Sequence, residues 1–108
     1  MTVEQLIKES GFRPIALPDK DREINGAYVG DLLSWVMGRA CSDNVWITIM
    51  SNLNVVAVAT LADVSCVIFA EGVTPDEELI KVAESKSVNL ICSDLSSYET
   101  AVKISGII

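Results

Sequence analysis

The 108-residue chain contains no histidine, and this absence removes several kinds of active site. Serine–histidine and cysteine–histidine nucleophiles, imidazole metal ligands and the usual general base near neutral pH are all excluded. The patterns GxxxxGK(S/T) and GxGxxG are also missing, so neither standard phosphate-binding loop can form. Any catalysis would have to use carboxylates, and we therefore expect a protein that is not an enzyme.

Positive charge is scarce and scattered along the chain. There are 8 Lys and Arg against 15 Asp and Glu, which gives a formal net charge of −7. The basic residues form no run, so general binding to a nucleic-acid backbone is not expected. The longest apolar stretch, residues 55–70, is interrupted by Asp63 and is shorter than the ~20 residues of a membrane-spanning helix. We expect neither a nucleic-acid partner nor a membrane.

The three cysteines form no CxxC pair. Cys66 and Cys92 fall inside apolar runs, where a free cysteine behaves as a small buried hydrophobic residue. Residues Met1–Leu6 have no basic segment followed by an apolar stretch, as a secretory signal would. These features favour a cytoplasmic location.

Three apolar runs of the second half of the chain each end in a short polar loop that carries a helix start signal. The runs are Val45–Met50, Cys66–Ala70 and Leu90–Cys92. This rhythm is typical of parallel α/β sheets, whose strands are buried on both faces. We therefore predict one α/β domain over residues 1–108. Its expected form is a two-layer or three-layer sandwich around a mostly parallel sheet of four or five strands, built from βα repeats.

Capping patterns indicate where the helices begin. Thr2–Gln5, Thr74–Glu77 and Ser96–Glu99 each have the form of a capping box, and Asp31 is placed to cap a helix that runs to Ala40. Extended pieces are predicted for residues 12–17, at a sheet edge because of the proline there, and for residues 23–29.

The segment Val55–Val64 allows two structures. Its β-branched residues alternate, and the loop before it could close a β-hairpin. Equally, Asn54 could cap a helix that crosses over to a parallel strand at Cys66. The residues alone leave both structures open.

Half of the residues are hydrophobic, and the mean hydropathy of +0.40 is high for a small monomer. A sheet buried on both faces would account for this value. Burial of part of the surface against a second copy of the chain would also account for it, and we expect a homodimer.

Polar residues follow the predicted strands at the end where a parallel sheet gathers its loops. Asp31, Glu71 and Asp94 could together bind a divalent cation, although a helix cap and two solvated loop residues explain them as well. No Lys or Arg lies in these loops, so phosphate would need a metal or a base such as Arg22 or Arg39 from another subunit. We predict no metal and no cofactor. The candidate ligand-binding residues are Asp31, Thr48, Ser51, Asn52, Asn54, Glu71, Gly72, Asp94 and Tyr98.

The chain resembles DRTGG-domain proteins over most of its length, from about residue 24 to 102. The segments that carry the resemblance are Gly26–Ser34, Val45–Thr48, Asn54–Ala59, Cys66–Gly72, Pro75–Glu77 and Asp94–Tyr98. Where the family motif has Asp-Arg, this chain has Asn52-Leu53. Where the motif has Thr-Gly-Gly, it has Ala70-Glu71-Gly72.

The resemblance implies a helix over Val55–Val64 and a regulatory or dimer-forming module. Such domains stand alone or are fused to phosphotransacetylases and to inorganic pyrophosphatases with CBS pairs. A distant likeness to the N-terminal domain of HPr kinase does not imply a kinase, because the phosphate-binding loop of the catalytic domain is missing here. We expect a non-catalytic module that senses a ligand or contacts a partner enzyme. The alternative is a protein that binds a small molecule or nucleotide through the loops at the carboxyl ends of its strands.

Overall fold

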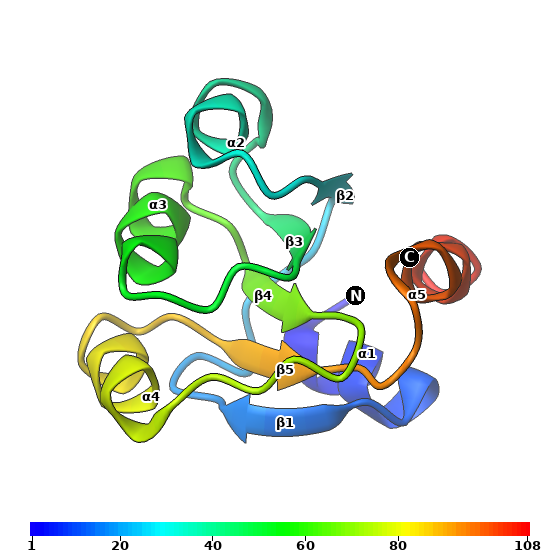
Figure 1. The fold of residues 1–108 in the computed structure, drawn as a ribbon. Coiled ribbons are helices and arrows are strands. Elements are labelled where there is room, and N and C mark those ends of the chain that lie inside the picture. Colours follow the sequence, from blue (N-terminus) through cyan, green and yellow to red (C-terminus); the bar gives the residue numbers. More distant parts are fainter.

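A five-stranded sheet lies between two layers of helices in the computed structural model, which describes all residues 1–108 (Figure 1). The strands are β1 (Arg13–Ala16), β2 (Gly26–Val29), β3 (Asn44–Thr48), β4 (Cys66–Phe69) and β5 (Leu90–Cys92). The helices are α1 (Val3–Ser10), α2 (Leu33–Arg39), α3 (Asn54–Ala62), α4 (Glu77–Ser85) and α5 (Ser97–Ser105). The predicted α/β class and the mostly parallel sheet are confirmed.

The strand order is β1-β5-β4-β3-β2. Strands β2 to β5 are parallel, with Thr48 paired to Phe69 and Phe69 to Cys92. Their carboxyl ends, and the loops that follow them, therefore share one end of the sheet. Strand β1 runs antiparallel to β5, and its first residue, Arg13, pairs with Cys92. The antiparallel direction brings the start of β1 to the same end.

Alternate residues of the central strands fill two separate cores. Trp46, Val67 and Phe69 lie on the face covered by α2, α3 and α4. Val45, Ile47 and their neighbours lie on the other face, against α1 and α5. Because both faces of β4 are covered, all four of its residues are buried, as the continuous apolar run predicts.

Two predicted capping boxes are confirmed, and two other predicted caps are wrong. The Thr2 and Ser96 hydroxyls each accept a hydrogen bond from the backbone N–H three residues on, and Gln5 and Glu99 bond back. Helix α4 instead begins after Asp76, whose carboxylate accepts from the N–H of Leu79. Thr74 therefore caps nothing, because a second capping residue lies closer to the apolar stripe.

Asp31 also does not cap its helix: α2 follows Leu32 without any side-chain cap. The segment after Asn54 is a helix and not a hairpin, which removes one of the two alternatives. Asn54 is its first residue, and the side chain of Asn52 accepts from the N–H of Asn54. Asn54 therefore does not cap this helix, which follows Leu53 without a side-chain cap.

The two edges of the sheet differ in their side chains. Edge strand β1 carries Arg13 and Pro14, which both discourage pairing with another chain. Edge strand β2 carries neither a charge nor a proline. Val29 on β2 is 50% exposed, although Ile47 beside it on the same face is fully buried. Helix α5 therefore leaves the outer part of this sheet face uncovered.

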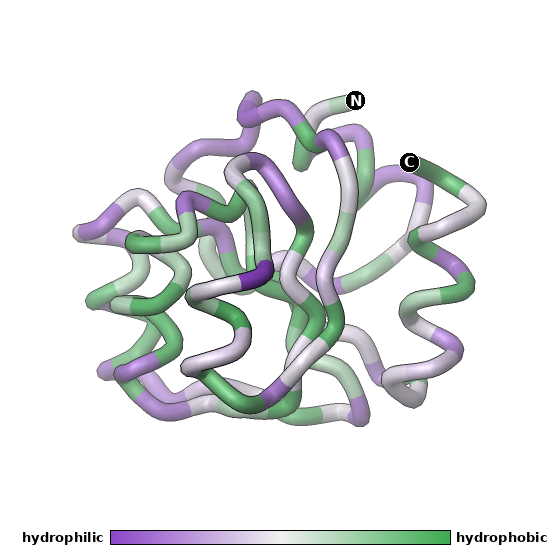
Figure 2. The backbone as a smooth tube through the Cα atoms, turned by 90° about the horizontal axis from the view of Figure 1, so that it is seen from above, coloured by the Kyte–Doolittle hydropathy of each residue, from purple (hydrophilic) through white to green (hydrophobic).

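The N- and C-termini lie near each other in both perpendicular views (Figures 1 and 2). Helices α1 and α5, at the two ends of the chain, pack together on one face of the sheet. Figure 2 shows hydrophobic and hydrophilic stretches alternating along the backbone. The helices of the structure are too short or too polar to cross a lipid bilayer.

Candidate functional site

Asp31 links the ends of two neighbouring strands. Its carboxylate accepts hydrogen bonds from the Thr48 hydroxyl at 2.8 Å and from the N–H of Ile49 at 2.9 Å. Thr48 is buried, and its hydroxyl oxygen also accepts from the N–H of Met50. Both predicted site residues are thus engaged in holding the loops that follow β2 and β3.

The loop after β4 is bonded to the loop after β5. Glu71 has a φ of 61° and Gly72 a φ of 73°, so both residues adopt the left-handed conformation. The N–H of Glu71 donates to the carbonyl of Leu95, and that of Gly72 donates to the carbonyl of Ser93. Glu71 thus stands at a position where the motif Thr-Gly-Gly has a glycine. Glycine adopts the left-handed conformation without strain.

The carboxylate of Glu71 also occupies the N-terminus of α5. Its Oε2 atom accepts a hydrogen bond from the N–H of Ser97 at 2.7 Å. An external anion would bind to the same free N–H groups. The chain therefore supplies its own anion at the start of α5.

A small pocket lies beside the end of β5. Its volume is about 210 Å³, and three of its side chains are charged: Arg13, Asp94 and Lys103. We call it the basic pocket, and its full lining is Ser10–Arg13, Cys92–Leu95 and Lys103. Arg13 reaches it because β1 is antiparallel, and Lys103 reaches it from α5. Of the predicted site residues, only Asp94 lines this pocket.

Several side chains of the basic pocket are held by contacts with neighbouring residues. The Ser93 hydroxyl is buried and lies 2.9 Å from the Thr100 hydroxyl, while it accepts from the N–H of Leu95. Lys103 lies over the ring of Phe12, with its Nζ atom 5.5 Å from the ring centre. Burial raises the pKa of the Cys92 thiol, and the nearby Arg13 guanidinium acts in the opposite direction. The thiol is therefore protonated near neutral pH and serves as a wall of the pocket.

Cys66 is buried as predicted, and burial raises its pKa to about 12. Neither strand cysteine is thus a reactive thiolate, whereas Cys41 is exposed.

The remaining candidate residues do not gather around one point. Asn52 and Asn54 are exposed at the start of α3, and no hydrogen bond joins the loop Ser51–Asn54 to the loops after β4 and β5. Tyr98 is 78% exposed on the first turn of α5. No three acidic or cysteine side chains form a group that could hold a metal ion, so Asp31, Glu71 and Asp94 do not converge.

Arg22 is not available as a phosphate ligand, because it is engaged at the opposite end of the sheet. Its guanidinium binds Asp43, just before β3, at 2.9 Å, and Asp63, just before β4, at 2.7 Å. Arg39 stacks on Trp35, with its guanidinium 3.5 Å from the ring centre. Both arginines named as possible phosphate ligands are thus already partnered within the chain.

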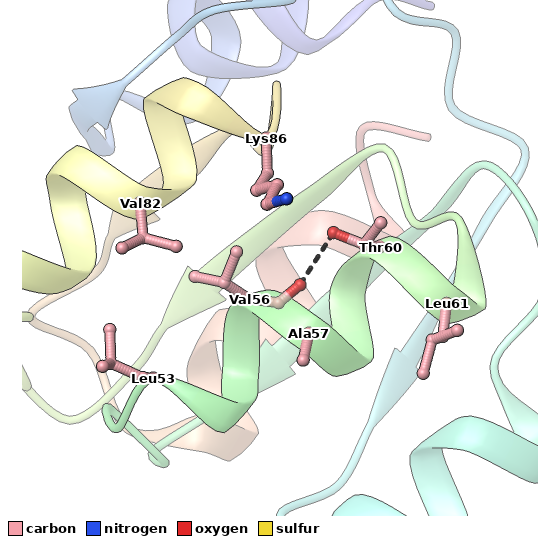
Figure 3. Close-up of a pocket in the computed structure, with 7 residues that line it drawn as sticks. All are labelled: Leu53, Val56, Ala57, Thr60, Leu61, Val82 and Lys86. Carbon is pink, nitrogen blue, oxygen red and sulfur yellow. Dashed lines mark hydrogen bonds between the residues drawn. The ribbon is translucent and has the colours of Figure 1, made fainter.

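A second hollow, of about 290 Å³, lies between α3 and α4 (Figure 3). Its lining is mainly apolar: Leu53, Val56, Ala57, Thr60, Leu61 and Val82, with Lys86 as the charged side chain. The Thr60 hydroxyl donates to the carbonyl of Val56, within its own helix, and is not directed at a ligand. This α3/α4 groove therefore offers apolar contact and one cation, and the sequence analysis did not identify it.

The fold is similar to that of a known regulatory region. A solved structure of the CBS and DRTGG domains of the regulatory region of Clostridium perfringens pyrophosphatase, complexed with the activator diadenosine tetraphosphate, has a similar fold. The TM-score is 0.77 at 15% sequence identity, and the match covers 95% of this chain but 45% of that one. No relative was found among curated proteins. A model of the DRTGG domain matches residues 20–107, and the chain therefore belongs to the DRTGG domain family.

Proposed function

We propose that this chain is a non-catalytic regulatory module that acts as a homodimer and senses a small metabolite or nucleotide. The observation that carries the proposal is the family membership, together with a similar fold inside the nucleotide-activated regulatory region of a pyrophosphatase. The missing histidine and phosphate-binding loops support a role without catalysis. A partner enzyme would then carry the activity that the module controls.

The edge at β2 supports a dimer. Four exposed apolar side chains belong to it: Val29, Leu32 and Trp35, each at least half exposed, and Ile49. We call this set the β2 edge surface. An uncharged edge strand with exposed apolar neighbours is a site where chains associate, and the other edge, β1, is protected against it. A second copy related by a two-fold axis would pair the two β2 strands and close the surface.

Light scattering coupled to size-exclusion chromatography tests the dimer. We expect two chains per particle for the wild-type protein and one chain for Val29→Lys, which places a charge on the β2 edge surface. Val102→Lys is the matched control, because Val102 on α5 is 51% exposed against 50% for Val29. A monomeric wild-type protein, or equal effects of the two substitutions, would contradict this interface.

Ligand sensing is tested separately by thermal unfolding with a panel of nucleotides, each with and without magnesium. Binding to the folded state raises the melting temperature, and the shift grows with ligand concentration. No shift with any nucleotide at millimolar concentration would remove the nucleotide from the proposal. The proposal includes a cytoplasmic location, which the free buried thiols of Cys66 and Cys92 support.

A further inference from the structure

The basic pocket brings together two cations that form no salt bridge, Arg13 and Lys103. We propose that it binds the phosphate group of a small ligand between Arg13 and Lys103. The inference rests on the proposed ligand-sensing function and names the chemistry that would be sensed. It concerns the pocket beside β5, and not the loops after β2 and β3.

Four of the eight basic side chains of this acidic protein are already partnered, and the other four are Arg13, Lys81, Lys86 and Lys103. Lys8 and Lys20 pair with Glu4, Arg22 pairs with two aspartates, and Arg39 stacks on Trp35. Arg13 and Lys103 form no salt bridge, although the chain carries 15 acidic residues. Arg13 and Lys103 line one pocket and form no salt bridge to Asp94, the carboxylate that shares it, so an anion between the two cations would relieve their mutual repulsion.

The basic pocket is a better place for a phosphate than the N-termini of α4 and α5, because side chains of the protein already occupy those N-termini. The start of α5 is filled by the Glu71 carboxylate, and the start of α4 by that of Asp76. An arginine offers two parallel N–H donors to phosphate oxygens, and a lysine adds a point charge. Arg13 on a strand and Lys103 on a helix provide this combination from two rigid elements.

The size of the pocket limits what can enter. Its 210 Å³ is below the roughly 300–1,000 Å³ of pockets that enclose a drug-sized ligand. A phosphate group fits such a space, whereas the base and sugar of a nucleotide would remain outside. Asp94 shares the pocket and repels a bare dianion, so it favours a ligand that brings a hydrogen-bond donor next to its phosphate.

Amide chemical shifts measured by NMR during titration test the site. The probes are inorganic phosphate, adenosine monophosphate and adenosine, added at constant ionic strength to the full chain. We expect saturable shifts for the amides of residues 11–13 and 93–95 with phosphate and with the nucleotide, but none with adenosine. Tighter binding of the nucleotide would identify a phosphorylated metabolite as the ligand, and equal binding would identify free phosphate.

Three variants separate this site from general attraction to charge. Arg13→Gln and Lys103→Gln should each weaken phosphate binding roughly tenfold, which is the effect of one charge-assisted hydrogen bond. Lys81→Gln makes the same change in net charge on α4, where Lys81 is exposed and forms no salt bridge, and should leave the affinity unchanged. Asp94→Asn should bind inorganic phosphate more tightly, because it removes the repelling carboxylate.

The inference is overturned if phosphate and the nucleotide leave the amides of the basic pocket unshifted at millimolar concentration, or if Lys81→Gln weakens binding as much as Arg13→Gln. Nucleotide-dependent shifts confined to residues 51–54 would also overturn it, while the proposed sensing function would stand. A monomeric protein that responds to no nucleotide anywhere would instead remove the proposed function itself.

Discussion

At the amino ends of β3 and β4, one arginine joins two aspartates, whereas at the carboxyl end beside β5 two cations share a pocket with Asp94 and form no salt bridge. Arg22 donates to Asp43 and Asp63, and the Ser42 hydroxyl donates to Asp63 at 2.6 Å. Both aspartates have a positive φ. The network therefore holds two strained turns in place.

The carboxyl end of the sheet is arranged differently. Two of its acidic residues, Asp31 and Glu71, accept hydrogen bonds from nearby backbone N–H groups. Its two cations, Arg13 and Lys103, form no salt bridge. The difference supports a stabilising role for the Arg22 network at the amino end and the proposed phosphate site at the carboxyl end.

The largest expected effect is that of Arg22→Ala. The substitution leaves Asp43 and Asp63 without their common partner and should lower the free energy of unfolding by about 2 kcal/mol. Arg13→Ala, the matched change at the carboxyl end, should lower it by less than about 0.5 kcal/mol, since Arg13 is exposed and forms no salt bridge. Urea denaturation of both variants measures these values. Equal losses would break the comparison between the two ends.

Asp31→Ala should have the next largest effect. It removes the acceptor of the Thr48 hydroxyl and of the Ile49 N–H, and Thr48 is buried. We expect a loss of about 1–2 kcal/mol in urea denaturation. Asp94→Ala is the control: Asp94 is exposed and accepts no hydrogen bond in the structure, so its removal should change stability by less than about 0.5 kcal/mol. A larger loss for Asp94→Ala than for Asp31→Ala would contradict the roles given to them.

Glu71→Gly should be nearly neutral. Glycine adopts the φ of 61° without strain, which gains about 1 kcal/mol. The change also removes the hydrogen bond from Ser97 at the start of α5 and frees the unfolded chain, which together cost about as much. We expect a net change within about 0.5 kcal/mol by thermal unfolding. Glu71→Ala keeps the strain and loses the bond, so it should be the less stable of the two.

The smallest effect concerns pH at the amino end. The Ser42 hydroxyl, followed by Arg22, lowers the pKa of Asp63 below its ordinary value of 3.8. The stabilisation is therefore present above pH 3.8 and is lost as the pH falls through the lowered pKa. Because Asp63 is mostly exposed, the loss should be below about 1 kcal/mol. Urea denaturation at decreasing pH should show a weaker dependence for Ser42→Ala than for the wild-type protein.

The central strands could be predicted from the sequence, but the edge could not be predicted in full. Runs of apolar residues in β3, β4 and β5 indicate strands buried on both faces, and this pattern carries the fold class. The residues of β1 indicate an edge strand through Pro14, but nothing in them encodes the direction in which a strand runs.

The candidate site was harder to predict, because the sequence does not encode the direction in which strand β1 runs. Loops after parallel strands were expected at one end, and they are found there. Arg13 and Lys103 lie far apart in the sequence and outside those loops, so only the topology brings them to one pocket. The position of Asp31 in the sequence suits a helix cap, whereas its partner, Thr48, lies on the neighbouring strand.

Strand β1 has a consequence for how such a domain can change over time. It precedes residues 20–107, the part that matches the family model, and it is held by a single neighbouring strand. A substitution at Arg13 would alter the charge beside β5 while the four parallel strands keep their pairing. The chemistry at the margin of the sheet can thus change without rebuilding the scaffold.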